Sequence, residues 1–190
     1  MREILEDFTS PDKIFHLSIV MSEDIEIELF RKWVSSFGES YIKSVGVEPY
    51  SKNVEIDGKN IKLVLRLCSL EARFFSIVEG VMRNLPLILL YNVSNNKTLN
   101  KLLENQFIKN LKQDVPILLV GNKSTLEQNR EVSKEQIEML KEQYNILASM
   151  EISLNTGENV EEMFRTTAKI LLKECEERKK KKKGRKKRKK

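Results

Sequence analysis

Short apolar runs alternate along the chain with longer segments of helical periodicity, and this alternation constrains the fold more than any other feature. Six runs are expected to form strands: residues 14–20, 50–56, 61–67, 85–91, 115–120 and 146–152. Five other segments have a helical pattern: 25–33, 71–84, 98–111, 133–144 and 159–177. Strands that alternate with helices of this length predict βαβ units and a doubly wound α/β sheet of six mostly parallel strands, with about five helices.

One connection departs from the parallel pattern. Asp57 and Gly58 separate two predicted strands, and this dipeptide favours a hairpin because a type I′ turn needs residues that tolerate positive φ. The hairpin would add one antiparallel strand at an edge of the sheet. Doubly wound sheets bind ligands at the carboxyl ends of their strands. The candidate functional loops are therefore those that follow Val20, Leu67, Val120 and Ile152.

The charge of the chain is divided between an acidic body and a basic end. Residues 178–190 contain 12 basic residues and one glycine, whereas the whole chain of 190 residues carries 34 Lys and Arg against 28 Asp and Glu. Without its end the chain would therefore have a net charge of −6 rather than +6. This division predicts a short N-terminal extension (1–13), one domain (14–177) and a disordered polybasic tail (178–190).

Other features argue against several classes of protein. No apolar run is long enough to span a membrane, and the acidic N-terminus does not resemble a signal peptide. Cys68 and Cys175 form no metal or redox pattern, which suits a reducing cytoplasmic compartment and leaves a peripheral membrane or nuclear location open. His16 has no triad partner and is expected to pack in the first strand, and Trp33 is expected at the core or its edge.

Several segments resemble motifs of the Ras and Rab small GTPases, in the order and spacing of that family. The sequence S-Y-I-K-S-V-G-V-E at 40–48 is similar to the first switch of Rab proteins, with Ser44 in place of threonine. The hairpin at 54–63 resembles the Rab interswitch, and E-A-R-F at 71–74 stands where Rab proteins have Q-E-R-F. V-P-I-L-L-V-G-N-K at 115–123 and E-I-S-L-N-T-G-E-N-V at 151–160 resemble the guanine-binding segments. The resemblance spans residues 14–172 and implies a small G-domain.

The segment that corresponds to the phosphate loop departs from the family pattern G-x-x-x-x-G-K-[ST], whose backbone, lysine and hydroxyl hold phosphates and Mg²⁺. Here the loop is about two residues shorter and contains neither glycine nor lysine. Its first six residues are Met21, Ser22, Glu23, Asp24, Ile25 and Glu26. Each carboxylate within 4 Å of a phosphate oxygen would repel it by roughly 1 kcal/mol in water and about 4 kcal/mol when semi-buried. A structural role explains the same residues: Ser22 caps the next helix, with Glu23 and Asp24 near its positive end.

Three further motifs of the nucleotide site are altered. Where the family has D-T-A-G-Q, this chain has Leu67, Cys68, Ser69, Leu70 and Glu71, so the resemblance implies no carboxylate for Mg²⁺ and no family-type hydrolysis. The base-reading motif N-K-x-D keeps Asn122 and Lys123, but Thr125 cannot replace an aspartate that accepts two hydrogen bonds. The family's S-A-K is replaced by Ser153, Leu154 and Asn155.

These departures favour a non-catalytic, small-GTPase-like scaffold that uses no cofactor and holds no metal. It would recruit a protein through the switch-equivalent faces, whose candidate residues are Ile42, Lys43, Val45, Val47, Glu71, Arg73 and Phe74. The alternative is a divergent switch in trafficking or signalling that binds GTP or GDP with Mg²⁺. Its support is Asn122, Lys123 and Ser44, and it would need Lys43 or Arg73 to reach the phosphates.

The basic end admits four interpretations. It could bind an anionic lipid surface, bind nucleic acid without reading sequence, direct the protein to the nucleus, or fold back on the acidic body. The candidate residues for a polyanion are Arg178, Lys179, Lys180, Arg185, Lys186 and Arg188. No cysteine for lipidation follows Cys175, and the sequence favours lipid slightly over nucleic acid.

Overall fold

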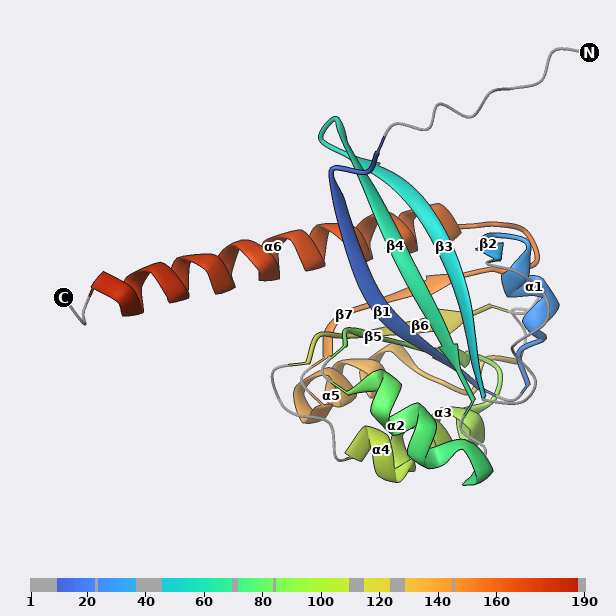
Figure 1. The fold of residues 1–190 in the computed structure, drawn as a ribbon. Helices are drawn as coiled ribbons and strands as arrows, with labels where there is room; N and C mark the ends of the chain where they lie inside the picture. The colour runs from blue at the N-terminus through green and yellow to red at the C-terminus, as the bar shows by residue number, and fades with distance from the viewer. Residues whose placement is uncertain are drawn as a thin grey trace, which may run out of the picture.

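A seven-stranded mixed sheet runs through the described part of the computed structural model (Figure 1). The structure describes residues 10–22, 24–36, 46–69, 72–83, 85–109, 115–123, 129–144 and 146–187. The strands are β1 (Lys13–Met21), β2 (Ser35–Ser36), β3 (Val47–Ile56), β4 (Lys59–Cys68), β5 (Leu87–Asn92), β6 (Ile117–Asn122) and β7 (Ile146–Ile152). They lie in the order β2-β3-β4-β1-β5-β6-β7. The strands from β4 to β7 in this order are parallel and β3 is antiparallel to β4, which confirms the predicted fold class.

The antiparallel edge has the predicted hairpin and one addition. Asp57 and Gly58 adopt φ values of 51° and 72°, and Ile56 pairs with Lys59 across the turn. Both turn residues therefore have the positive φ that a type I′ turn requires. The addition is β2, a two-residue strand that pairs antiparallel with β3 and was not predicted, because a run of two serines carries no strand pattern.

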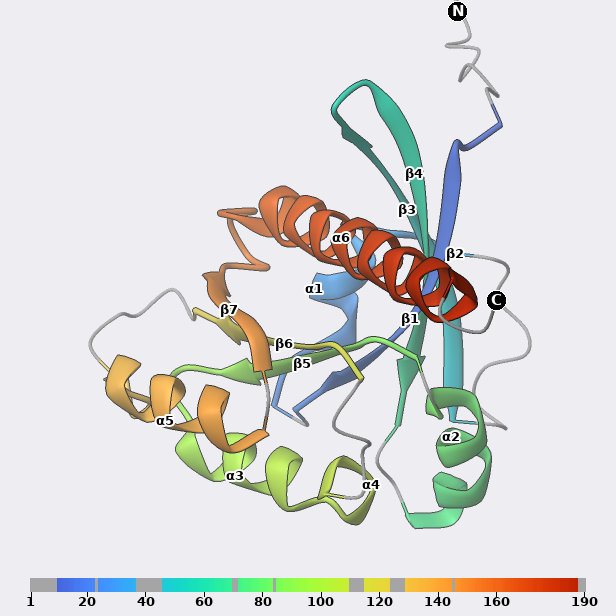
Figure 2. The same ribbon diagram turned by 90° about the vertical axis from the view of Figure 1, so that its left-hand side faces the viewer.

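Helices cover both faces of the sheet (Figure 2). One face is covered by α1 (Ile27–Arg31) and α6 (Val160–Lys187), and the other by η1 (Ala72–Phe74), α2 (Phe75–Met82), α3 (Asn96–Glu104), α4 (Gln106–Lys109) and α5 (Lys134–Tyr144). Each face has its own apolar core, centred on Phe164 and Phe30 on the α6 side and on Met82 and Leu99 on the α2 side. The parallel strands β5 and β6 are buried on both faces, as their uninterrupted apolar runs predict.

The helix predicted over 98–111 is divided in the structure. Its first part begins two residues earlier, as α3, and ends at Glu104. Asn105 follows with φ −55° and ψ 130°, outside the helical region, and α4 begins at the next residue. Asparagine is a poor helix former whose side chain competes for backbone hydrogen bonds, so a break here has a local cause.

The last helix is longer than its sequence pattern predicts. Val160, Phe164, Ala168 and Leu171 are buried on one face, as expected. Lys13 Nζ, in β1, donates a hydrogen bond of 3.2 Å to Cys175 Sγ, which ties the end of this packed part to the sheet. The helix then continues to Lys187, which differs from the prediction that residues 178–190 form a disordered tail.

Helix propensity explains this extension. Lysine and arginine are good helix formers, and a helix that is already nucleated by packing needs only elongation. An ion pair of 3.7 Å between Glu174 and Arg178 bridges the junction at a spacing of four residues. No helix in the described residues is both long and apolar enough to cross a membrane.

Candidate functional site

The loop after β1 is held by its own side chains. The Ser22 amide continues the β1–β5 pairing by donating to Leu90 O at 2.8 Å, and the Ser22 hydroxyl donates to Asp24 Oδ1 at 2.6 Å. Asn95 Nδ2, in the loop after β5, donates to Asp24 Oδ2 at 3.3 Å. A carboxylate therefore links the carboxyl ends of two adjacent strands, in the position where such sheets bind ligands.

The helix after this loop is short and begins later than predicted. Its N-cap is Glu26, with extended backbone and no capping hydrogen bond from its side chain, so the prediction that Ser22 caps the helix is wrong. The reason is local: the Ile25 amide donates to Ser22 O at 3.1 Å, which forms a separate turn before the helix, and the Ser22 hydroxyl is already bound to Asp24. Glu23 lies outside the described residues.

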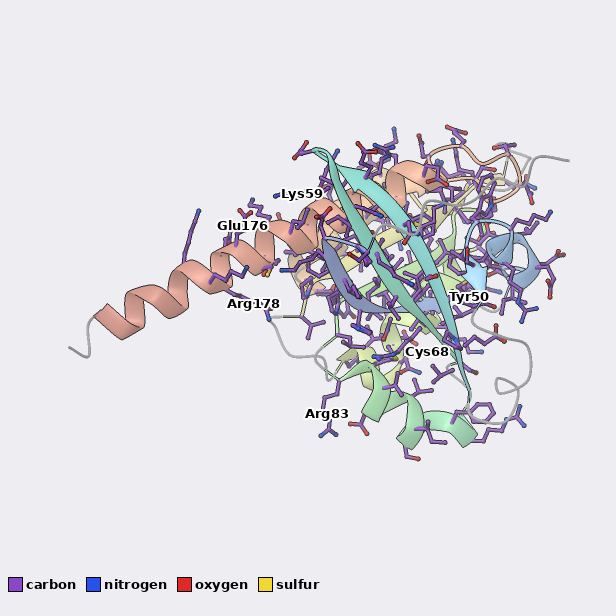
Figure 3. All side chains as sticks on the ribbon, turned by 45° about the horizontal axis from the view of Figure 1, so that its top comes forward. Tyr50, Lys59, Cys68, Arg83, Glu176 and Arg178 are labelled. Carbon is purple, nitrogen blue, oxygen red and sulfur yellow. The ribbon has the colours of Figure 1, made fainter. Side chains whose placement is uncertain are left out.

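The end of β4 is apolar. Leu67 and Cys68 are 6% and 4% exposed and point into opposite cores, and the Ser69 amide donates to Gly46 O at 2.8 Å. Burial raises the pKa of the Cys68 thiol to about 12. Figure 3 labels Cys68 near the end of β4. Neither side chain offers the oxygen ligand that Mg²⁺ requires, because Leu67 has no ligand atom and Cys68 carries a buried thiol. Leu70 and Glu71 lie outside the described residues.

The ends of β6 and β7 are joined by the residues predicted to line a base pocket. Asn122 is 7% exposed, and its Oδ1 accepts a hydrogen bond of 3.0 Å from the Leu154 amide. Lys123 forms an ion pair of 2.7 Å with Glu158. The structure therefore brings Asn122, Lys123 and the 153–158 loop together, and their polar groups are paired to one another.

The 153–158 loop is a compact turn. Ser153 is buried, its amide donates to Glu158 O at 2.9 Å, and its carbonyl accepts from the Gly157 amide at 2.8 Å. Leu154 is fully buried in the core beneath α6, whereas Asn155 is exposed. Thr125 lies outside the described residues.

Trp33 covers this turn, a contact that the sequence pattern did not reveal. Its indole Nε1–H donates to Leu154 O at 3.0 Å. Gly157 has φ 86°, and a Cβ built there would lie 2.4 Å from Trp33 Cη2. Trp33 packs at the edge of the core, as predicted, but the helical spacing that placed it on the first helix gave no sign of this contact, and α1 ends before it.

Comparison with known proteins decides the family. Residues 29–173 match the family model described as the Ras family, which is more than half of the chain. The chain belongs to the Ras family. Rab-8B of Homo sapiens is 31% identical to it over 149 residues, which are 76% of this chain and 70% of that protein. Rab-8A of Mus musculus is 32% identical over 146 residues, which are 74% and 69% of the two chains.

In this Ras-family chain the first switch-equivalent segment is only partly described. Ile42, Lys43, Ser44 and Val45 lie outside the described residues, and Val47 begins β3, half-buried against the α2-side core. The two ends of the segment are linked by Arg31 of α1, whose guanidinium donates to Tyr50 Oη at 2.8 Å and to both Glu48 oxygens at 2.9 and 3.1 Å. The hydrogen bond with Tyr50, and then that with Glu48, raises the pKa of Arg31.

The second switch-equivalent segment offers a different surface from the one predicted. Arg73 stacks its guanidinium 4.4 Å from the centre of the Phe74 ring. Phe74 is 8% exposed and belongs to the α2-side core, which differs from the prediction that it faces a partner. Ile77 of α2 is instead 44% exposed, and sequence periodicity alone could not separate these two positions.

The remaining predicted residues lie on α6 or form no site. Arg178, Lys179 and Lys180 are exposed, Arg185 and Lys186 lie within the helix, and Arg188 is outside the described residues. Among the residues that the structure describes, no group of three His, Cys, Asp or Glu side chains could hold a metal ion.

Proposed function

We propose that this Ras-family chain is a non-catalytic interaction scaffold that has lost family-type binding and hydrolysis of GTP. The observation that carries the proposal is the Asp24 carboxylate, which Ser22 and Asn95 hold at the ends of β1 and β5. A nucleotide whose phosphates lay at these strand ends would meet a fixed negative charge. Asp24 is exposed, so at 4 Å that repulsion is about 1 kcal/mol, and it adds to the absence of the glycine-rich backbone and lysine that would attract phosphate.

The short α1 supports the same conclusion. A phosphate loop works because glycine-rich backbone turns its N–H groups toward the anion at the start of a helix. This loop has no glycine, and α1 has five residues, too few to form a strong dipole. The family match begins at Leu29, after this loop, in agreement with its divergence.

The base-binding side supports the proposal independently. The Leu154 amide donates to Asn122 Oδ1 at 3.0 Å, so this oxygen is already used within the protein and is not available to a base. Trp33 covers the same turn and binds Leu154 O. Lys123 is already paired with Glu158. We infer that the protein's own side chains fill the region that a guanine base would need.

The described residues do not fit GTP with Mg²⁺. Leu67 and Cys68 end the strand that supplies a metal-binding aspartate in the family, and no serine or threonine follows a lysine in the loop after β1. We therefore derive no hydrolytic step for this chain.

The retained surfaces give the scaffold its interactions under this proposal. Val47, Arg73 and the exposed Ile77 would contribute to a protein-binding face, together with the switch-equivalent segments outside the described residues. The basic end of α6 would add attachment to an anionic surface. The proposal includes a cytoplasmic location, with peripheral attachment to a membrane or a nuclear location left open.

Calorimetric titration of the full chain with GDP, GTP and ATP, each with and without Mg²⁺, tests the proposal. Polyphosphates can bind the basic helix, so tripolyphosphate is the matched control for charge alone. We expect GTP, ATP and tripolyphosphate to give the same heat, which falls with salt and does not depend on Mg²⁺. Rab-8B in the same buffers serves as the positive control.

Guanine-specific, Mg²⁺-dependent binding at micromolar concentration or tighter would refute the proposal. Hydrolysis of GTP above the buffer rate, abolished by Lys123→Ala, would refute it as well. Either result would favour the second candidate, a divergent GTP-binding switch, whose structural support is the retained arrangement of Asn122 and Lys123 beside the 153–158 loop.

A further inference from the structure

The final part of α6 projects beyond the rest of the fold. Figure 1 shows the C-terminal part of the α6 ribbon extending to one side, beyond the other helices and strands. Glu176 and Arg178 lie where the helix leaves the body (Figure 3). At 1.5 Å per residue, the ten residues from 178 to 187 form a rod of about 15 Å. Nine of these ten residues are lysine or arginine.

The charge spacing of this rod matches that of a nucleic-acid duplex. Nine positive charges along about 15 Å give one charge per roughly 1.7 Å of helix axis. Double-stranded DNA carries one negative charge per about 1.7 Å of its own axis. The widths also agree, because an α-helix with side chains measures about 10–12 Å and the major groove of B-DNA is about 12 Å wide.

We propose that residues 178–187 of α6 form a sequence-independent binding site for the phosphate backbones of double-stranded DNA. Basic residues occupy nine of ten successive helical positions, which are about 100° apart around the axis, so no side of this segment lacks a basic position. A helix in the major groove has a phosphate backbone on each side, so both sides of the rod would be used. The proposal rests on the electrostatic attachment included in the proposed function, and it does not depend on the loss of GTP binding.

The helical state of this segment reverses the preference that the sequence gave for lipid. A helix that lies in a membrane interface buries an apolar face, and residues 178–187 contain no apolar side chain. The straight helix also leads these residues away from the acidic body, so it does not support folding back (Figure 1).

The same composition predicts how the complex would behave. Residues 178–190 include no aromatic residue to stack on bases and no Asn or Gln to read adenine, and their uniform run of lysine and arginine sets no pattern of base contacts, so contacts to phosphate should dominate. Contacts to about nine phosphates give a limiting slope near −8 for the logarithm of affinity against the logarithm of salt concentration. Double-stranded RNA should bind less tightly, because its deep and narrow major groove does not admit a helix.

Fluorescence anisotropy with the full chain and labelled duplexes of about 20 base pairs, at salt from about 50 to 200 mM, measures this interaction. We expect tight binding at low salt, little difference between unrelated DNA sequences, and a loss of about a thousandfold or more across the salt range. Replacing the nine basic residues of 178–187 by glutamine should reduce affinity by at least about a hundredfold.

Three single variants test whether the helix itself matters. Lys182→Gln and Lys182→Pro remove the same charge, but only proline breaks the helix. We expect Lys182→Gln to reduce the salt slope by about 1, and Lys182→Pro to reduce it by at least about 3. Gly184→Ala keeps every charge and removes a residue that disfavours helix, so its affinity should equal or exceed that of the natural chain.

Vesicles containing about 30% phosphatidylserine provide the competing surface. Tighter binding to these vesicles than to duplex DNA, at equal anionic concentration, would overturn the proposal. Equal affinity for RNA and DNA duplexes, or equal slopes for Lys182→Pro and Lys182→Gln, would overturn binding as a helix in the groove. DNA affinity that survives the glutamine replacement would overturn the assignment to α6. None of these outcomes depends on whether the chain binds guanine nucleotide.

Discussion

Trp33 and Gly157 should be energetically coupled, because the indole occupies the space that a side chain at position 157 would need. The perturbation is a double-mutant cycle of Trp33→Ala and Gly157→Ala. The Gly157 backbone has φ 86°, and a new Cβ would lie 2.4, 3.0 and 3.2 Å from three atoms of the Trp33 ring. The first distance is too short for any carbon contact, so the ring must move when alanine is introduced.

The magnitude follows from these two effects. Placing alanine at positive φ costs about 1–2 kcal/mol whether or not Trp33 is present. In the natural background the displaced ring also loses its hydrogen bond to Leu154 O and part of its packing, which adds about 1–2 kcal/mol. Gly157→Ala should therefore cost about 2–4 kcal/mol alone and about 1–2 kcal/mol in the Trp33→Ala background.

Urea denaturation of the four proteins, followed by far-UV circular dichroism, measures the coupling. Intrinsic fluorescence is unsuitable because Trp33 is the sole tryptophan of the chain. Trp33→Phe is the matched control, since it retains an aromatic ring and removes the indole donor, and it should cost about 1 kcal/mol. If the two single effects add within about 0.5 kcal/mol, the two residues are not in contact and the description of a covered turn is wrong.

Three further predictions address other parts of the molecule. Burial holds the pKa of Cys68 at about 12 against an ordinary value of 9.0, so the folded state retains a proton that the unfolded state loses. The contribution of the protonated thiol to the free energy of unfolding is therefore complete below pH 9 and is lost as the pH rises toward 12. Cys68→Ala should make the alkaline fall in unfolding free energy shallower by up to about 1.4 kcal/mol per pH unit. Parallel curves for the two proteins would contradict this. Arg31→Met should destabilise by about 1–3 kcal/mol in urea, because Glu48 loses its cation, and Glu48→Gln in the same chain should restore part of that loss; a cost below about 0.5 kcal/mol would show that the network is unimportant. A photo-crosslinking amino acid at Ile77 should capture a protein partner in cell extract, whereas the same amino acid at Met139 of α5, which is more exposed (66% against 44%), should not; equal capture at both positions would argue against the switch-equivalent face.

The sheet could be predicted because its signals are local. The apolar runs of β5 and β6, each entered through a proline, and the turn at Asp57 and Gly58 identify strands and a hairpin without knowledge of the rest of the fold. The joining of Asn122 to the 153–158 loop followed from the family resemblance and from the rule that strand ends share one edge.

The details that escaped prediction depend on contacts between distant residues. Ser22 has the composition of a helix cap, but its hydroxyl binds Asp24, so the cap falls at Glu26. Trp33 donates a hydrogen bond to a turn more than a hundred positions away in the sequence, and no local sequence pattern predicts that contact. The length of α6 was underestimated because a run of like charges was interpreted as disorder, although packing nucleates the helix upstream.

Because α6 is one continuous helix, it also separates the opposite charges of the molecule along a single axis. The acidic body and the basic rod are joined by one helix, so their opposite charges are held apart along a fixed axis rather than averaged by a loose connection. The protein therefore carries a large permanent dipole aligned with its last helix. In the field of any polyanion, it would rotate before contact and arrive with the rod first. Approach would therefore select the orientation in which the body is bound.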